Sequence, residues 1–277
     1  MKLAFNGATT MRADLATDVK VAATAGFEYL EIWAAKLRAF LENNSVSDLK
    51  TLFAEHNIKP LSINSIEHIT FRDAEAYASI RKQCQELSEV AAQIDCPYIV
   101  VVPGRLPQGG ADRFKVIEES VKVLDDLCDI AGSFGVSLAF EFLGQTDCSV
   151  QTLDLAHEIV RTTGRKNLKL VIDSFHFYAG GSTVEMIEAL DPNLLAVFHI
   201  NDAEDRPQSE LADSHRLFPG LGILPLRAMI SSFTRIGYDG ATSVEIFRPE
   251  YWEMDALEVA RKSHAATQHV LASTASA

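Results

Sequence analysis

The sequence predicts a (β/α)8 barrel, an α/β fold in which eight parallel strands each lead into a helix. Short runs rich in Val, Ile, Leu and Phe alternate with longer segments of helical periodicity, a pattern typical of βα units around a parallel sheet. We count eight such runs, whereas an open doubly wound sheet more often has about five to seven strands. No low-complexity linker divides the chain, so we expect residues 1–277 to form one barrel domain with its active site at the carboxyl ends of the strands.

The eight predicted strands are short apolar runs separated by segments long enough to hold a helix. They cover residues 2–6, 29–33, 60–64, 98–102, 136–142, 168–173, 195–200 and 242–247. Gly26, Asn57, Gly135, Gly164 and Gly237 each lie a few residues before one of these runs, where a helix often ends on a residue in the left-handed conformation. These residues therefore mark the ends of the helices that precede the strands.

The connections between the strands differ in character. Residues 74–94 carry apolar side chains at spacings of three and four, which predicts a helix with one face on the sheet. Ser182 and Glu185 have the spacing of a capping box and predict a helix start. Residues 103–111 and 201–224 are long connections that follow strands, so we expect both at the active-site end of the barrel, the second as a partial lid.

Composition and charge exclude several classes of protein. The chain is 47% hydrophobic and 23% charged, as in ordinary soluble proteins, and apolar runs such as residues 98–102 are far shorter than the roughly 20 residues that span a bilayer. The net charge of -13 disfavours nucleic acid as a partner. The four cysteines are widely spaced and form no C-x-x-C motif, which indicates reduced thiols. Since no signal peptide is recognisable, we expect a cytoplasmic protein without a membrane partner.

Four metal-competent side chains occur where the last four predicted strands end: Glu141, Asp173, His199 and Glu245. One such residue alone is explained by helix capping or an ion pair, but four on adjacent strands meet at one end of a barrel. Three carboxylates without a cation would repel one another, so the sequence predicts one divalent ion between them. Oxygen-rich ligation with one imidazole suits Mn²⁺, Mg²⁺, Co²⁺ or Zn²⁺, and the ligand types do not choose among these.

Five further residues are candidates for binding a substrate. His176, in the turn after the sixth strand, emerges beside the predicted ligands or else caps the next helix. Arg216, in the long loop, is a clamp for an anion or hydroxyl, or forms a surface salt bridge. Arg248, just after the eighth strand, lines the pocket or orients a ligand. Trp33 and Asn64, at the ends of the second and third strands, offer an apolar wall and a hydrogen-bonding group.

Several stretches of the chain resemble, in the same order and over nearly the full length, the xylose isomerase-like TIM barrels, a sugar phosphate isomerase/epimerase family, and within it the inosose isomerases of inositol catabolism. They are "MKLAFNGATT", "EFLGQTDCSV", "VIDSFHF", "HINDAEDRP", "FPGLG" and "SVEIFRPEY". The resemblance implies that the four strand-end side chains hold one divalent metal and that His176 and Arg216 contact substrate oxygens. Asp147 stands where ketose epimerases of the family have a glutamate, which leaves the sugar specificity open.

The predicted chemistry is proton transfer on a cyclic polyol ketone or a sugar. A hydroxyketone bound through adjacent oxygens beside a cation has a more acidic neighbouring C–H, so a carboxylate can remove this proton and give an enediolate. We expect Glu141 and Glu245 to be the acid/base pair of an intramolecular oxidoreductase-type isomerase that moves the ketone. The alternatives are a dehydratase acting on inosose or dehydroshikimate, a ketose 3-epimerase, and a barrel that binds a polyol without turnover. The sequence leaves the subunit number open, a homo-oligomer included.

Overall fold

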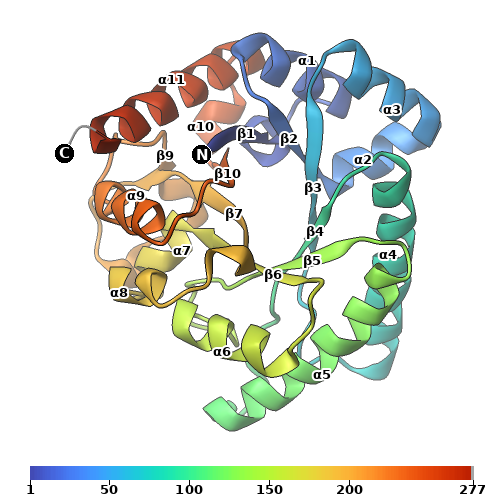
Figure 1. Cartoon of the computed structure of the whole chain (residues 1–277), viewed down its shortest axis with the longest axis vertical. Coiled ribbons are helices and arrows are strands. Elements are labelled where there is room, and N and C mark those ends of the chain that lie inside the picture. Colours follow the sequence, from blue (N-terminus) through green and yellow to red (C-terminus); the bar gives the residue numbers. More distant parts are fainter. Residues whose placement is uncertain (276–277) are drawn as a thin grey trace.

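A closed barrel of eight parallel strands surrounded by helices forms the centre of the protein (Figure 1). The computed structural model describes residues 1–275. The strands follow the order β1-β10-β7-β6-β5-β4-β3-β2, and the ring closes where the last strand pairs with the first, with Phe5 opposite Val244. The predicted (β/α)8 barrel is therefore confirmed.

The barrel strands lie close to the predicted runs. They are β1 (Lys2–Asn6), β2 (Tyr29–Trp33), β3 (Lys59–Ile66), β4 (Tyr98–Val101), β5 (Ser137–Glu141), β6 (Leu168–Asp173), β7 (Leu195–Ile200) and β10 (Ala241–Val244). Strand β3 is longer than predicted because a register shift after Asn64 lets Ile66 pair with Val101. Strand β10 ends earlier than predicted, so Glu245 directly follows the strand instead of lying within it.

The helices occupy the predicted connections. Their bounds are α1 (Leu15–Ala25), α2 (Ala34–Leu41), α3 (Val46–Glu55), α4 (Ala74–Gln93), α5 (Arg113–Gly132), α6 (Leu153–Thr163), α7 (Ser174–Ala179), α8 (Val184–Glu188), α9 (Leu226–Arg235), α10 (Pro249–Trp252) and α11 (Ala256–Ala275). All five predicted helix-end residues have positive φ, and Gly26 and Gly164 directly follow α1 and α6. No helix within residues 1–275 is long and apolar enough to cross a membrane.

The predicted capping box at Ser182 and Glu185 is wrong. Helix α8 begins after Thr183, which makes no side-chain cap. The hydroxyl of Ser182 turns to the neighbouring helix instead, where its Oγ accepts a hydrogen bond from the backbone N–H of Leu153 at 3.0 Å. This contact satisfies an N–H at the start of α6, whose own cap residue, Thr152, makes no side-chain hydrogen bond to the helix backbone.

The long connection at residues 201–224 contains a small antiparallel sheet of its own. Strand β8 (Asp202–Ala203) pairs with β9 (Arg216–Leu217). The buried carboxylate of Asp202 accepts hydrogen bonds from the backbone N–H groups of Gly220 at 3.0 Å and Leu224 at 2.8 Å, which fixes the far end of the segment. The segment is thus an ordered structure on the barrel, and its action as a lid stays a prediction.

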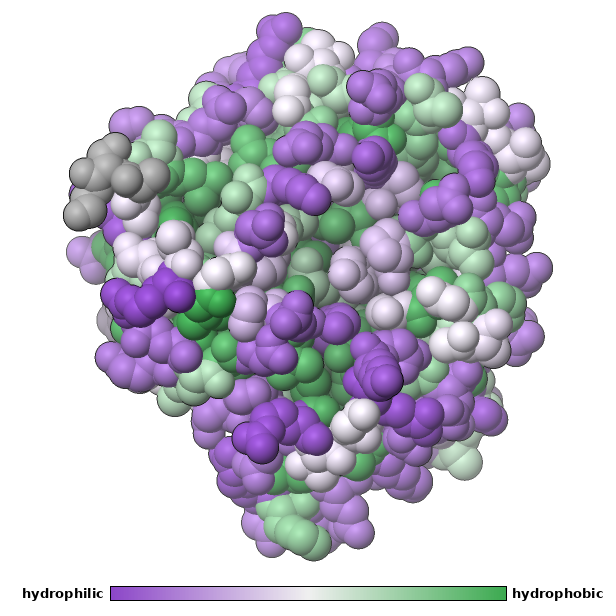
Figure 2. All heavy atoms as spheres, in the orientation of Figure 1, coloured by the Kyte–Doolittle hydropathy of each residue, from purple (hydrophilic) through white to green (hydrophobic). Residues whose placement is uncertain are grey.

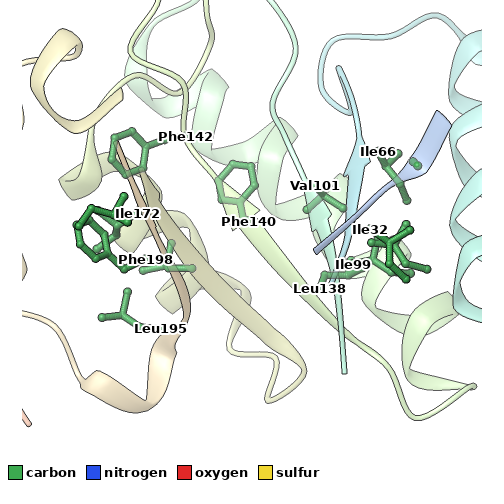
Figure 3. Close-up of a cluster of buried hydrophobic side chains, with 14 of the residues drawn as sticks. Ile32, Ile66, Ile99, Val101, Leu138, Phe140, Phe142, Ile172, Leu195 and Phe198 are labelled. Atoms are coloured by element: carbon green, nitrogen blue, oxygen red, sulfur yellow. The ribbon is translucent and has the colours of Figure 1, made fainter. Parts of the chain in front are cut away.

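Alternation along the strands separates two apolar layers. One lies between strands and helices, and Figure 3 shows part of it, including Phe140, Ile172 and Phe198. The other fills the barrel interior with smaller side chains, among them Ala139 and Val171. Successive side chains of a strand point to opposite faces of the sheet. A residue that directly follows an outer-layer residue along a strand therefore points into the barrel.

On the face that Figure 2 shows, hydrophilic side chains predominate.

A buried ion pair fastens the segment after β1 to the first two helices. The Nζ atom of Lys36, in α2, lies 2.7 Å from Oδ2 of Asp18, in α1, and both side chains are almost fully buried. Lys36 also donates hydrogen bonds of 2.8 Å to the carbonyl oxygens of Gly7 and Thr10, in the short 3-10 helix that follows β1. The pair therefore joins three elements at the active-site end of the barrel.

We predict that Lys36→Met lowers the free energy of unfolding by about 3–5 kcal/mol, because it leaves the Asp18 carboxylate buried without its counter-charge, which the hydrogen bond from Thr10 does not replace. Urea unfolding followed by circular dichroism measures the loss. The double variant Lys36→Met/Asp18→Asn carries no buried charge at this position and should regain part of the stability. Equal stability of the single and double variants would contradict this account of the pair.

Candidate metal centre

The four side chains predicted as metal ligands meet in the structure. Glu141, Asp173, His199 and Glu245 each offer one ligand atom, and these atoms all lie within 4.8 Å of one another. Each residue is at most 3% exposed. They come from β5, β6 and β7 and from the residue directly after β10. The structure thus brings together residues that are up to 104 positions apart in the sequence, while their role as ligands stays a prediction.

The strand pattern explains why these side chains face the barrel interior. Phe140, Ile172 and Phe198 belong to the outer apolar layer (Figure 3), and the next residue along each strand is one of the cluster. Val244 stands in the same relation to Glu245. Each cluster residue therefore follows an outward-packed side chain at the carboxyl end of its strand, and alternation turns it inward.

The donor set fits a divalent cation. Three buried carboxylates and one imidazole are the ligand types that bind such ions in oxygen-rich sites. Burial raises the pKa of Glu141 to about 7; His199 opposes this shift, and the negative charges of Glu245 and Asp173 add to it. Burial lowers the pKa of His199, but the carboxylates of Glu245, Glu31 and Glu141 outweigh burial and raise it well above its usual value. The cluster thus carries excess negative charge that a cation would neutralise.

Arg216 supplies part of the counter-charge from behind the cluster. Its guanidinium Nη1 lies 2.7 Å from Oδ2 of Asp173 and 3.2 Å from Oε2 of Glu245. The group also contacts the ring faces of Phe175 and Phe247, whose centroids lie 4.9 and 5.1 Å from Cζ. Arg216 is fully buried, so the surface salt bridge considered for it is wrong. The geometry thus makes Arg216 a counter-charge of the cluster; it is not among the residues that line the cavity, and its contact with substrate stays a prediction.

A cavity of about 460 Å³ opens beside the cluster at the carboxyl ends of the strands. Glu141 and Glu245 line this cavity, whereas Asp173 and His199 do not. A ligand in the cavity would therefore meet two of the three carboxylates of the cluster directly.

Of the predicted substrate contacts, Trp33, Asn64 and His176 line the cavity. Trp33 packs against Phe247 with ring centroids 5.7 Å apart and forms an apolar wall, as expected. The amide of Asn64 donates a 2.8 Å hydrogen bond to Oε1 of Glu245, so it holds a cluster carboxylate as well as facing the cavity.

Arg248 is not among the residues that line the cavity, and its contact with a substrate stays a prediction. Its Nη1 lies 2.8 Å from Oε1 of Glu204 and its Nε lies 3.2 Å from Oε2 of Glu250. The guanidinium also lies over the ring of Tyr251, 5.6 Å from the centroid. These partners hold the side chain against α10 and the 201–224 segment.

His176 presents a neutral imidazole to the cavity. Its Nε2 lies 3.1 Å from Nη2 of Arg216, and a guanidinium only donates, so Nε2 accepts and the ring proton lies on Nδ1. Burial lowers the pKa of His176 by more than the Asp173 carboxylate raises it. Nδ1 is buried and has no hydrogen-bond partner among the described residues. An unpaired N–H group beside a cavity is a donor suited to a ligand oxygen.

Three further carboxylates stand among the otherwise mostly uncharged residues of the cavity wall. Glu67, Asp147 and Asp213 line it in addition to the cluster carboxylates. Arg105 is the one Lys or Arg side chain among the lining residues that the structure describes, and its Nε is 3.0 Å from Oδ2 of Asp147. The cavity therefore offers no unpaired basic side chain to an anionic substrate.

Glu31 and the asparagines around the cluster are site residues that the sequence reasoning missed. Glu31, in β2, is fully buried, and its Oε1 lies 3.0 Å from Nε2 of His199. Asn6 donates hydrogen bonds to Glu31 at 3.1 Å and to Glu245 at 3.0 Å, and Asn201 donates one to Asp173 at 2.9 Å. A signal for Glu31 was present, because one carboxylate inside the apolar run "YLEIW" repeats the pattern of "LAFEF".

Comparisons with known proteins agree with this architecture. A model of the xylose isomerase-like TIM barrel family matches residues 19–268. The inosose isomerase of Bacillus velezensis is 36% identical over 273 residues, which cover 98% of this chain and 97% of that protein. The inosose isomerase of Bacillus subtilis strain 168 is 37% identical over 268 residues, or 95% and 96% of the two chains. The crystal structure of the IolI protein with a bound zinc atom matches with a TM-score of 0.95, 36% identity and 99% coverage of both chains.

We predict that a divalent metal stabilises the protein, because the ion neutralises the buried carboxylates of the native state. At a free concentration about 100 times the Kd, binding adds about 2.7 kcal/mol, which for a chain of this size raises the Tm by about 5–11 °C. Thermal unfolding with Zn²⁺, Mn²⁺, Co²⁺ or Mg²⁺, and again after chelation, measures the rise. Asp173→Asn should show a much smaller rise, and a wild-type Tm unchanged by all four ions would contradict the metal site.

We predict that Arg216→Met lowers the free energy of unfolding of the metal-free protein by about 3–5 kcal/mol, because Asp173 and Glu245 lose their buried counter-charge. Arg113→Met is the matched control, since that side chain is half exposed and its ion pairs with Asp154 and Glu158 should contribute at most about 1 kcal/mol. Urea unfolding compares the two variants. A similar small loss in both would show that Arg216 does not balance the charge of the cluster.

Proposed function

The chain belongs to the xylose isomerase-like TIM barrel family, and we propose that it is an inosose isomerase, a metal-dependent enzyme that moves the ketone of a cyclic polyol by one position. The proposal rests on one observation above all: two carboxylates of the four-residue cluster, Glu141 and Glu245, face the same cavity. Relatives named inosose isomerase match nearly the whole chain and support this choice of reaction.

We propose that Glu141, Asp173, His199 and Glu245 hold one divalent ion. Zinc is the first candidate, because the IolI crystal structure contains a bound zinc atom, while Mn²⁺, Co²⁺ and Mg²⁺ suit the same donor set. The bound ion would supply positive charge that stabilises the negative charge developing on the carbonyl oxygen of the substrate.

The two glutamates would exchange protons with the substrate. One carboxylate removes the proton from the hydroxyl-bearing carbon beside the ketone, and a proton is returned to the former carbonyl carbon. The proton of the hydroxyl passes to the former carbonyl oxygen, so the ketone moves by one position with no net loss or gain of protons. Glu245 is held firmly, since Asn6 and Asn64 donate to its Oε1 and Arg216 donates to its Oε2. Glu141 has one hydrogen-bond donor among the described residues, His199, and is therefore freer to gain and release a proton.

We propose an uncharged polyol ketone as the substrate. Arg105, the one Lys or Arg side chain among the described lining residues, is already paired with Asp147, so the cavity offers no free cationic side chain to a phosphate or carboxylate group. This argues against dehydroshikimate and sugar phosphates. The apolar face of Trp33 suits the C–H groups of a ring, and about 460 Å³ lies within the usual range for small-molecule sites.

Incubation of the metal-loaded protein with inososes, ketohexoses and dehydroshikimate in D₂O, followed by NMR, tests the reaction. We expect deuterium to enter an inosose at the carbons that exchange the ketone, with no vinylic signal, and no turnover of dehydroshikimate. A vinylic product would identify a dehydratase, and exchange restricted to ketohexoses would identify an epimerase; either result contradicts the proposal. A metal-stripped sample serves as the control.

Three further expectations stay predictions: that the chain is one domain, that it is cytoplasmic and that it forms a homo-oligomer.

We predict that Glu141→Gln and Glu245→Gln each lower kcat by at least about 100-fold, because an amide cannot exchange the proton. Metal content is measured for each variant, so that loss of the ion is not mistaken for loss of the acid or base. Glu250→Gln is the matched control, because this glutamate is exposed in α10 close to Glu245 in sequence and should keep full activity. Full turnover by a metal-loaded Glu245→Gln variant would contradict the assignment of Glu141 and Glu245 as the acid/base pair.

A further inference from the structure

Glu31 is a buried carboxylate that the proposed proton transfer does not use. It is fully buried within β2, does not line the cavity and is not one of the four residues that could hold the metal. A buried charge without a partner is costly, so its position calls for a physical explanation. The explanation lies in the contact between Glu31 and His199.

The two ring nitrogens of His199 face different partners. Nδ1 lies 2.9 Å from Oε1 of Glu141 and 3.4 Å from Oε2 of Glu245, so it is the nitrogen that belongs to the cluster. Nε2 lies on the other side of the ring, 3.0 and 3.2 Å from the two carboxylate oxygens of Glu31. A carboxylate only accepts hydrogen bonds, so both ring nitrogens carry a proton while no ion is bound. An ion bound within the cluster would replace the proton on Nδ1 and leave the proton on Nε2, which faces Glu31 alone.

We propose that Glu31 is a positioning residue for the metal centre: it keeps the proton of the His199 ring on Nε2 and holds the ring so that Nδ1 is the ligand atom. The inference rests on the proposed metal site and adds a residue to it. Histidine ligands commonly donate their second N–H to a carboxylate, which fixes the tautomer and orientation of the ring. Here β2 would contribute to a site whose ligands come from the opposite side of the barrel.

Glu31 is itself held in place by the first strands of the barrel. Ser62, in β3, donates a 2.6 Å hydrogen bond to its Oε2, and Asn6, in β1, donates a 3.1 Å hydrogen bond to its Oε1. The same Asn6 amide donates to Oε1 of Glu245 at 3.0 Å. The position of Glu31 is thus fixed relative to both His199 and a second predicted ligand, as a positioning role requires.

The affinity for Co²⁺ and Zn²⁺, measured by competition with a chromophoric chelator, tests the role of Glu31 without relying on activity. We expect Glu31→Ala to lower the affinity about 10- to 100-fold, whereas Glu31→Gln keeps an acceptor oxygen for the Nε2 proton and should recover most of the loss. Asp18→Asn is the matched control: it also removes a fully buried carboxylate and destabilises the chain, but it lies away from the cluster and should change the affinity less than about twofold.

The ring tautomer provides a second readout in the unaltered protein. Long-range ¹H–¹⁵N correlation spectra of the zinc-loaded, ¹⁵N-histidine-labelled chain should show His199 with a protonated Nε2 and a metal-bound Nδ1. The His199 signal is identified by its absence from a His199→Gln variant. This spectrum decides the tautomer even where Glu31→Ala fails to fold.

The outcomes separate the inference from the proposed function. A wild-type protein that binds neither ion would contradict the proposed metal site itself. A wild-type protein that binds metal through Nε2, a loss below about threefold in Glu31→Ala, or an equal loss in Asp18→Asn would overturn only the positioning role. A loss specific to Glu31→Ala, with recovery in Glu31→Gln, supports it.

Discussion

Buried negative charge at the carboxyl ends of the strands is the constraint on which the rest of the site depends. Four carboxylates, those of Glu31, Glu141, Asp173 and Glu245, lie almost fully buried around one imidazole. In a medium of low dielectric constant such groups repel one another strongly unless cations or hydrogen-bond donors lie between them. Arg216 pairs with two of these carboxylates, and the ligand atoms of the cluster lie close enough together to hold a divalent ion, which links the stability of the barrel to the proposed chemistry.

The two halves of the closed barrel contribute different kinds of residue to the site. The second half, from β5 to β10, presents the predicted ligands, because each follows an outward-packed residue at the end of a strand. The first half supplies donors and acceptors that hold those ligands, through Asn6, Glu31 and Asn64. A closed ring is needed for this arrangement, since β1 reaches Glu245 only by pairing with β10. The long 201–224 segment completes the site by inserting Arg216.

The sequence predicted the barrel and the meeting of the four cluster residues because both follow from local patterns, namely strand periodicity and a polar residue at the end of each apolar run. It did not predict the surroundings of these residues. Arg216 lies 43 positions from Asp173, and only the fold of the long loop shows that it is buried. Glu31 resembles any single charge in an apolar strand until the barrel closes and places it against His199. The capping box failed because Ser182 bonds to a different helix, a contact that spacing along the chain cannot show.

The account depends most on one ion lying among four side chains at the barrel mouth. Crystals grown with zinc or manganese, and measured on both sides of the absorption edge of that metal, test this directly. We expect one strong anomalous difference peak within bonding distance of Glu141, Asp173, His199 and Glu245. An anomalous map without a peak there, or with its strongest peak at another position on the chain, would contradict the account.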